Sequence, residues 1–389
     1  MDVLKNLISC RKEKADVAWL SPEVAAEVRR FHETVPGYRP TELKSLPELA
    51  AACGVGQLLV KDESSRFGLK AFKGLGGIYA LGLEAARILN ITEPTFPRLT
   101  TPGARAALNT TVFATATDGN HGKGVAWAAA LLGCEARVYM PAGSSPLRAQ
   151  AIRDAGQAQV TITQWNYDDT VAYVSRLARE KGWLLVQDTS WTGYEAVPRH
   201  IMQGYTTMVE EALEQMDGEK PTHVFLQAGV GAMAGAVTGY LAARFGAEMP
   251  RIVYVEPYEA ACIYESMAAG DGSPHTARGN GRTIMAGLNC GSPCTIAWPI
   301  LRDYGGFAAV CGDEAAEAGM RALAARGIVS GESGASALGA FLELIKNRAQ
   351  RELLGLNGSS RVLFFSTEGD TDPVSYAQIV SKTHNEERK

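Results

Sequence analysis

Short apolar runs alternate along most of this chain with longer segments in which apolar residues recur every three or four positions. The runs predict strands and the longer segments predict helices. The predicted strands are 57–63, the run TTVFATAT, 135–141, 159–163, 183–187, 222–228, 251–257 and 361–367. The predicted helices are 22–35, 46–53, 72–89, 121–132, 146–155, 167–181, 201–216, 232–245, 313–326 and 335–347. Because strands and helices alternate, we expect an α/β fold with mostly parallel sheets.

The segment Asn90–Ala107 divides this pattern, because it has three prolines and no apolar periodicity. Such a composition is typical of a boundary loop. We therefore expect two α/β domains, with the smaller one inserted into the larger. The predicted large domain comprises residues 1–88 and 190–389, and the predicted smaller domain comprises residues 89–189.

Composition and charge favour a small-molecule ligand. The chain has 389 residues and a net charge of −4, from 38 basic and 42 acidic residues. No positive field is therefore available to hold a nucleic acid or an anionic membrane surface. The apolar run Val125–Leu132 is too short to cross a bilayer, and the first residues do not have the pattern of a signal peptide. We expect a cytoplasmic protein.

The seven cysteines do not have the spacing of a zinc site, so no metal is predicted. A contact between Cys262 and Cys290 is one interpretation of their positions near glycine-rich segments. Idle thiols are the alternative, as expected in a reducing compartment.

One strand, glycine turn and helix resembles a dinucleotide-binding fingerprint. The sequence THVFLQAGVGAMAGAVTGY places Gly229, Gly231 and Gly235 after a strand, and the next strand carries Glu256 near its end. Backbone amides at such a helix start can hold a phosphate, and an acidic residue there can hold a ribose. Two alternatives stay open from this segment alone: a nicotinamide-dependent oxidoreductase, and a glycine turn without a ligand.

A second group of residues favours a different cofactor. Lys73 lies at a predicted strand-to-helix junction, and the segment Asp118–Gly122 follows another predicted strand. Open α/β sheets bind ligands at such strand ends. An aldehyde cofactor needs an amine for a Schiff base and a cup for its phosphate, whereas hydride transfer needs no lysine at this position. A surface lysine is the alternative for Lys73, and Lys61 and Lys123 are interpreted either as surface charges or as charges behind the residues that contact the ligand.

Four segments, in this order and spacing, resemble the tryptophan-synthase-like (fold type II) pyridoxal-phosphate enzymes: the stretch from PTELKSLPELAA to AFKGLGG, then TDGNHGKGVAW, AGVGAMAG and STEGDTDP. The resemblance covers about Tyr38 to Asp372. Within that group the motifs NYDDTV, VQDTSWTGY and TIMAGLNCG are similar to the diaminopropionate ammonia-lyases rather than to the threonine or serine dehydratases. The resemblance implies two three-layer α/β domains with pyridoxal 5'-phosphate in the cleft between them, and a homodimer.

The resemblance also implies roles for single residues. Lys73, preceded by Phe72, falls on the Schiff-base lysine, although Ala71 stands where the group has serine. Asn120 falls on the asparagine that faces the ring hydroxyl of the cofactor. The phosphate-holding loop matches Gly229, Val230, Gly231 and Ala232, and the two side chains there are tolerable only at negative φ. Thr367 aligns with the hydroxyl partner of the pyridine nitrogen, and Ser366 is the alternative.

Asp118 stands where the hydroxyamino-acid dehydratases of this fold commonly have serine. A carboxylate attracts the 3-ammonium group of diaminopropionate by a charge-assisted hydrogen bond, and a neutral hydroxyl would leave it poorly satisfied. The expected reaction is an α,β-elimination that yields pyruvate and two ammonia. Lys73 would remove the Cα proton of the L isomer and Asp118 that of the D isomer, while Asp188 would receive the substrate's ammonium group.

For some of these residues a purely structural role is the alternative to a role in catalysis. Asp118 and Asp188 can each be a helix cap or a loop residue, and His121 is expected to be a hydrogen-bonded neighbour of the site rather than a catalyst. The alternatives for the whole chain are a threonine/serine dehydratase or D-serine deaminase on the same fold, the oxidoreductase built on the Gly229–Glu256 unit, and a non-catalytic binding protein.

Overall fold

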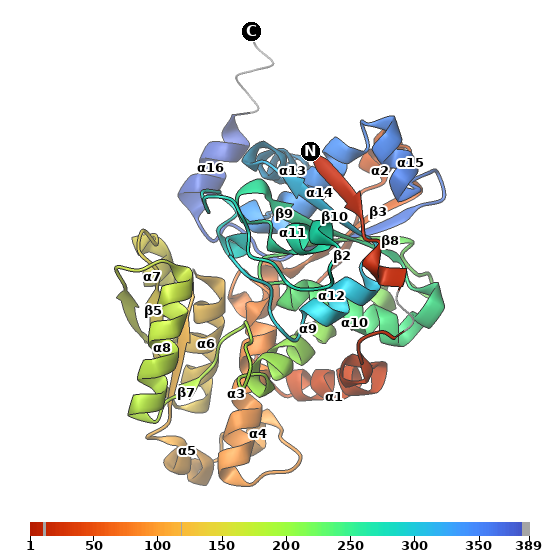
Figure 1. Ribbon diagram of the computed structural model, residues 1–389. Coiled ribbons are helices and arrows are strands. Elements are labelled where there is room, and N and C mark those ends of the chain that lie inside the picture. Colours follow the sequence, from red (N-terminus) through yellow and green to blue (C-terminus); the bar gives the residue numbers. More distant parts are fainter. Residues whose placement is uncertain (11–12, 118, 383–389) are drawn as a thin grey trace. The chain divides into compact units, whose positions relative to one another are not determined.

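The structure, a computed structural model, describes residues 1–10, 13–117 and 119–382 (Figure 1). Its described residues form two compact units, each assembled from separate parts of the sequence. The first unit comprises Met1–Pro22, Pro40–Ser65 and Met208–Lys389, and the second comprises Glu23–Arg39 and Arg66–Thr207. Residues 23–39, 66–88 and 190–207, which the sequence analysis places in the large domain, lie in this second unit.

The first unit contains a seven-stranded sheet within the described chain, in the order β1-β10-β9-β8-β11-β3-β2. The strands are β1 Asp2–Lys5, β2 Leu43–Ser45, β3 Gln57–Asp62, β8 His223–Gln227, β9 Arg251–Pro257, β10 Phe307–Cys311 and β11 Arg361–Ser366. The two edge strands, β1 and β2, are antiparallel to their neighbours, and the inner pairs are parallel. The carboxyl ends of β3, β8, β9 and β11 therefore meet at one edge of this sheet.

Helices cover both faces of that sheet. Successive side chains of a strand point to opposite faces, and Val253 and Val255 of β9 join the core under α14 while Tyr254 reaches Thr238 of α10, with 3.0 Å between the two hydroxyl oxygens. The helices of this unit are α2 Pro47–Cys53, α10 Ala232–Phe245, α11 Cys262–Ala269, α12 Trp298–Tyr304, α13 Asp313–Ala324, α14 Glu332–Leu344, α15 Arg348–Leu354 and α16 Pro373–Ser381.

The second unit contains a four-stranded parallel sheet in its described part, in the order β6-β5-β4-β7. Its strands are β4 Val112–Ala116, β5 Glu135–Met140, β6 Gln159–Ile162 and β7 Leu184–Leu185. Its helices are α1 Pro22–Glu33, α3 Lys73–Leu89, α4 Phe96–Leu99, α5 Pro102–Leu108, α6 Asn120–Leu132, α7 Pro146–Gly156 and α8 Tyr167–Lys181, and helix α9, Ala196–Gln215, starts in this unit. Both sheets agree with the predicted α/β class.

Several local predictions were wrong. The predicted boundary loop 90–107 contains two short helices, α4 and α5, because Pro97 and Pro102 lie in their first turns, where a missing N–H group is harmless. Helix α9 begins at Ala196, five residues before the predicted start. Lys61 is not a surface charge: it is fully buried, and its Nζ lies 2.7 Å from Glu211.

Small residues let α3 approach its neighbouring helices closely. A Cβ atom on Gly124 of α6 would lie 3.0 Å from the carbonyl oxygen of Lys73, and one on Gly204 of α9 would lie 2.7 Å from the carbonyl oxygen of Leu75. These glycines fix the position of the first turns of α3, where Lys73 begins the helix.

Replacing Gly204 with alanine is expected to lower the free energy of unfolding by about 1–3 kcal/mol, since the new methyl group meets backbone atoms that cannot turn aside. Gly103→Ala is the matched control, because Gly103 lies in α5 with no atom within 4 Å of its Cβ position. The control should leave stability unchanged or raise it by up to ~1 kcal/mol. Urea denaturation measures both variants, and equal stabilities would contradict the close crossing.

No helix among residues 1–10, 13–117 and 119–382 has the length and apolar character needed to span a membrane.

Candidate active site

Lys73 is the first residue of α3, and its amine is surrounded by aromatic rings and a carboxylate. Nζ lies 5.3 Å from the ring centre of Phe72 and 5.8 Å from that of Tyr205. It donates a hydrogen bond of 2.5 Å to Asp188. Only 20% of the lysine side chain is exposed, so the surface-lysine alternative is wrong.

Asp188 lies in the loop that follows β7, and β7 is the parallel neighbour of β4. Because these two strands end side by side, the loop after β7 lies next to the start of α6. Burial alone would raise the pKa of Asp188, but His121, which is charged only at the acid pH where Asp188 titrates, and the charge and hydrogen bond of Lys73 lower it to about 2. Asp188 is therefore ionised at neutral pH and forms an ion pair with Lys73.

His121 is buried beside this pair. Its Nε2 lies 2.8 Å from the carbonyl oxygen of Val186, which can only accept, so Nε2 carries the proton. Its Nδ1 lies 3.8 Å from Asp188. Burial lowers the pKa of His121, so the ring is neutral at pH 7 and serves as a hydrogen-bonded neighbour of the site.

Two residues that the sequence analysis did not single out hold the Asp188 loop. The side-chain amide of Gln187 accepts from the backbone N–H of Ala116 at 3.0 Å and donates to its carbonyl at 2.9 Å. The hydroxyl of Tyr194 accepts from the backbone N–H of Gln187 and donates to the carbonyl of Leu185. Both residues lie in the quoted motif VQDTSWTGY, which could have drawn attention to them.

Two predicted site residues lie in the sequence around the start of α6. Asn120 is the first residue of the helix, whereas Asp118 lies outside the described residues. The hydroxyl of Thr117 accepts from the backbone N–H groups of Gly119 at 3.0 Å and Gly122 at 3.1 Å. Thr117 thus satisfies amides at the start of α6, a role that the sequence analysis considered for Asp118.

In the first unit, the predicted phosphate loop connects β8 to α10. Gly231 has φ +88° and no side chain caps the helix start. Val230 and Ala232 are not among the described residues with positive φ. Side chains are therefore tolerated at these two positions of the loop. A hydrogen bond to the segment after this unit's glycine-rich stretch fixes the loop: the N–H of Cys294 donates to the carbonyl of Val230 at 2.7 Å.

A Cβ atom at Gly229 would lie 3.1 Å from the sulfur of Cys290 and 3.1 Å from the carbonyl oxygen of Gly287. The Cys262 thiol donates to the carbonyl of Gly229 at 3.6 Å. Cys262 and Cys290 thus both flank this glycine, and the structure has them as thiols rather than as a disulfide.

Glu256 cannot serve as a ribose ligand. It is fully buried, and the two oxygens of its carboxyl group accept from the backbone N–H groups of Ile263 at 2.9 Å and Tyr264 at 2.7 Å. Burial raises its pKa to about 8, against the effect of these two hydrogen bonds. Glu256 satisfies amides in the first turn of α11, which removes the basis of the nicotinamide alternative.

The two hydroxyls at the end of β11 have different partners. Ser366 donates to the hydroxyl of Ser330 at 2.8 Å, whereas Thr367 accepts from the side-chain amide of Gln227 at 2.8 Å. The Thr367 proton has no acceptor among the described residues, so this hydroxyl can donate to a bound group.

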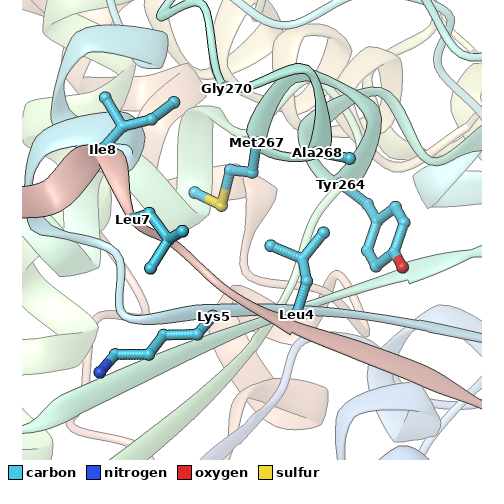
Figure 2. Close-up of a pocket in the computed structure, with 8 residues that line it drawn as sticks. All are labelled: Leu4, Lys5, Leu7, Ile8, Tyr264, Met267, Ala268 and Gly270. Atoms are coloured by element: carbon cyan, nitrogen blue, oxygen red, sulfur yellow. The ribbon is translucent and has the colours of Figure 1, made fainter.

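A separate pocket of about 800 Å³ lies in the first unit and includes none of the predicted site residues. Figure 2 shows Leu4 and Leu7, from β1 and the segment after it, facing Met267 and Tyr264 of α11.

The residues present fit a phosphorylated pyridine aldehyde. Within the second unit, Lys73 at the start of α3 supplies a primary amine, and Asn120 begins α6, the helix that crosses closely to α3 at Gly124. Within the first unit, the Gly229–Ala232 loop offers a cradle of backbone N–H groups that a side chain at Gly229 would close, and Thr367 offers a hydroxyl proton.

This chain belongs to the family of pyridoxal-phosphate dependent enzymes, which matches residues 34–368. It is similar to diaminopropionate ammonia-lyase of Salmonella typhimurium (strain LT2), with 46% identity over 397 residues that cover 97% of this chain and 98% of that protein. Among solved structures it is similar to holo diaminopropionate ammonia lyase from Escherichia coli, with a TM-score of 0.91, 43% identity and coverage of 98% and 97% of the two chains.

A structure of the Escherichia coli enzyme in complex with an aminoacrylate-PLP azomethine reaction intermediate matches with a TM-score of 0.87 and 42% identity, over 98% of this chain and 97% of that chain. These findings confirm the resemblance, the fold class and the cofactor, pyridoxal phosphate, that the sequence motifs predict. The nicotinamide alternative is wrong.

Replacing Asp188 with asparagine is expected to flatten the acid dependence of stability in the cofactor-free protein. A carboxyl whose folded pKa is about 2, below its ordinary value, stabilises the fold above that ordinary value and loses this contribution as the pH falls. The difference in free energy of unfolding between the original protein and the variant should therefore shrink between about pH 5 and pH 3. Urea denaturation at several pH values measures it.

Asp154→Asn is the matched control, since Asp154 is exposed on α7 and should give a small difference at every pH. An Asp188→Asn difference that stays constant with pH would contradict the ion pair.

Proposed function

We propose that this chain catalyses the pyridoxal-phosphate-dependent elimination of ammonia from 2,3-diaminopropionate, with pyruvate and two ammonia as products. The observation that carries the proposal is the identity of 46% to a diaminopropionate ammonia-lyase along 97% of the chain. The largely buried Lys73–Asp188 pair supports it, because it gives the chain a primary amine and a carboxylate within hydrogen-bonding distance.

Pyridoxal phosphate, when bound, supplies an aldehyde for the substrate's amino group and a ring that withdraws electrons from Cα. Lys73 holds this cofactor and removes the Cα proton of the L isomer. Phe72, which precedes the lysine in sequence, contributes to the binding of the cofactor, and the backbone amides of Gly229, Val230, Gly231 and Ala232 hold its phosphate. When the cofactor is bound, Asn120 would face its ring hydroxyl and Thr367 would donate to its ring nitrogen.

Asp188 receives the substrate's ammonium group. It is already ionised and buried at neutral pH, and it accepts a hydrogen bond from an ammonium group, that of Lys73. A substrate ammonium offers the same charge and the same donors. His121 keeps this loop in place through Val186 and stays neutral, so it adds no positive charge that would compete for the carboxylate.

Asp118 makes the chain selective for a 3-ammonium group and removes the Cα proton of the D isomer. This role rests on the sequence, in which a carboxylate replaces the serine of the hydroxyamino-acid dehydratases. When the substrate carries a neutral hydroxyl in place of the 3-ammonium group, the buried carboxylate has no cationic partner. An unpaired carboxylate is costly in a site without water, so such substrates bind less well.

A coupled assay of pyruvate release tests the function. D- and L-diaminopropionate are expected to react with kcat/KM at least about a hundredfold above those of D-serine, L-serine and threonine, with threonine followed through its own keto acid. Faster turnover of serine or threonine would favour a dehydratase on the same fold. A yellow protein that turns over none of these compounds would favour a binding protein.

The homodimer and the cytoplasmic location are proposed on the resemblance and the composition. Gel filtration with light scattering tests the first, and fractionation of the source cells tests the second.

A further inference from the structure

Gln227 is the last residue of β8 and is separated from the predicted phosphate loop by Ala228 alone. It is buried, with 2% of its surface exposed. Its Nε2 makes two short hydrogen bonds to the neighbouring strand end, to the carbonyl oxygen of Phe365 at 2.8 Å and to the hydroxyl oxygen of Thr367 at 2.8 Å, and a longer contact of 3.5 Å with the carbonyl oxygen of Gly334. Neither the loop nor the expected chemistry assigns a role to this side chain.

The contact with Phe365 determines which way the amide of Gln227 faces. A backbone carbonyl can only accept, so the NH₂ group and not the oxygen must face Phe365. The same NH₂ group then donates its second proton to Thr367, and the Thr367 oxygen acts as acceptor. The hydroxyl proton of Thr367 must therefore point away from Gln227.

The neighbouring hydroxyl is arranged differently. Ser366 donates its proton to Ser330 at 2.8 Å, and successive residues of an extended strand face opposite sides. Of the two hydroxyls that align with the pyridine partner, Thr367 is thus the one that retains a proton to donate.

We propose that Gln227 is a positioning residue that keeps the Thr367 hydroxyl oriented as a hydrogen-bond donor to the pyridine nitrogen, so that this nitrogen stays unprotonated. The proposal rests on the proposed function and deepens it. A neutral ring withdraws electrons less strongly than a protonated one. The neutral ring is sufficient for an elimination, because the departing leaving group quickly removes the negative charge from Cα.

The test is the ¹⁵N resonance of holoenzyme loaded with cofactor that is ¹⁵N-labelled at the ring nitrogen, compared with the neutral and protonated forms of the unbound cofactor. The original protein is expected at the neutral position. Gln227→Glu introduces an acceptor, which reverses the hydrogen bond: Thr367 donates to the carboxylate and offers a lone pair to the nitrogen. The resonance should then move toward the protonated position.

Because a buried carboxylate is costly, Gln227→Met provides a second variant without charge. It leaves the Thr367 hydroxyl unfixed, so the resonance should move from its original position and the dissociation constant of the cofactor should rise about fivefold to tenfold. Gln378→Glu, on the exposed surface of α16, controls for added charge and should change neither quantity. Thr367→Val should move the resonance, whereas Ser366→Ala should leave it in place.

A neutral resonance that stays unchanged in both Gln227 variants would overturn the proposal, as would a protonated nitrogen in the original protein. A resonance that responds to Ser366→Ala but not to Thr367→Val would also overturn it. These outcomes are independent of the proposed function, which fails instead if the original protein binds the cofactor and releases no pyruvate from diaminopropionate.

Discussion

Lys73→Ala is expected to lower pyruvate release from both isomers of diaminopropionate by at least about a thousandfold, because it removes the only group proposed to form a covalent bond with the cofactor. In the original protein, borohydride reduction should bleach the yellow colour and leave the label on the peptide that contains Lys73. The assay is steady-state pyruvate release, combined with mass spectrometry of the reduced protein.

Lys73→Arg separates the covalent role from the ion pair. A guanidinium keeps a positive charge beside Asp188 but does not form the imine, so turnover should fall as far as in Lys73→Ala. Lys181→Ala, at the exposed end of α8, is the control and should keep full activity. Turnover that survives in Lys73→Arg, or a reduced label on another lysine, would contradict the assignment.

Asp118→Ser is expected to abolish turnover of D-diaminopropionate, by at least about a hundredfold, while the cofactor stays bound and keeps its absorbance. The variant loses both the proposed base for the D isomer and the charge that attracts the 3-ammonium group. Turnover of the L isomer should fall less, because Lys73 still provides its base. The measurement is kcat/KM for the two isomers and for D- and L-serine.

Selectivity against serine should fall in the same variant, since a serine at position 118 no longer leaves a carboxylate unsatisfied. Asp154→Ser, which removes an exposed carboxylate of α7, is the matched control and should change none of these ratios. Unchanged turnover of the D isomer by Asp118→Ser would show that another group removes its proton.

The alternation of strands and helices could be predicted from the sequence because buried parallel strands are short continuous apolar runs and helices repeat every 3.6 residues. The motifs around Lys73, Asn120 and Gly229 were also visible, because glycines and polar residues interrupt those patterns at strand ends. The helices α4 and α5 were missed because prolines break a periodic pattern whether they end a helix or begin one.

Other features depend on residues that are distant in sequence. Glu256 had the spacing of a ribose ligand, yet the fold uses its carboxylate for the amides of α11. Gln227 has no motif of its own, and only the pairing of β8 with β11 brings it to Thr367. Lys61 has the sequence context of any charged strand residue, and only the fold brings Glu211 beside it.

By itself, the sequence determined the α/β class, the family and the residue types of the site, because these follow from local periodicity and from short motifs. The tertiary structure decided which carboxylate faces the Lys73 amine, which hydroxyl of β11 keeps its proton, and which acidic residue is occupied in holding a helix. Such partnerships depend on strand order and on close helix crossings, which bring together groups more than a hundred residues apart, as with Lys73 and Asp188.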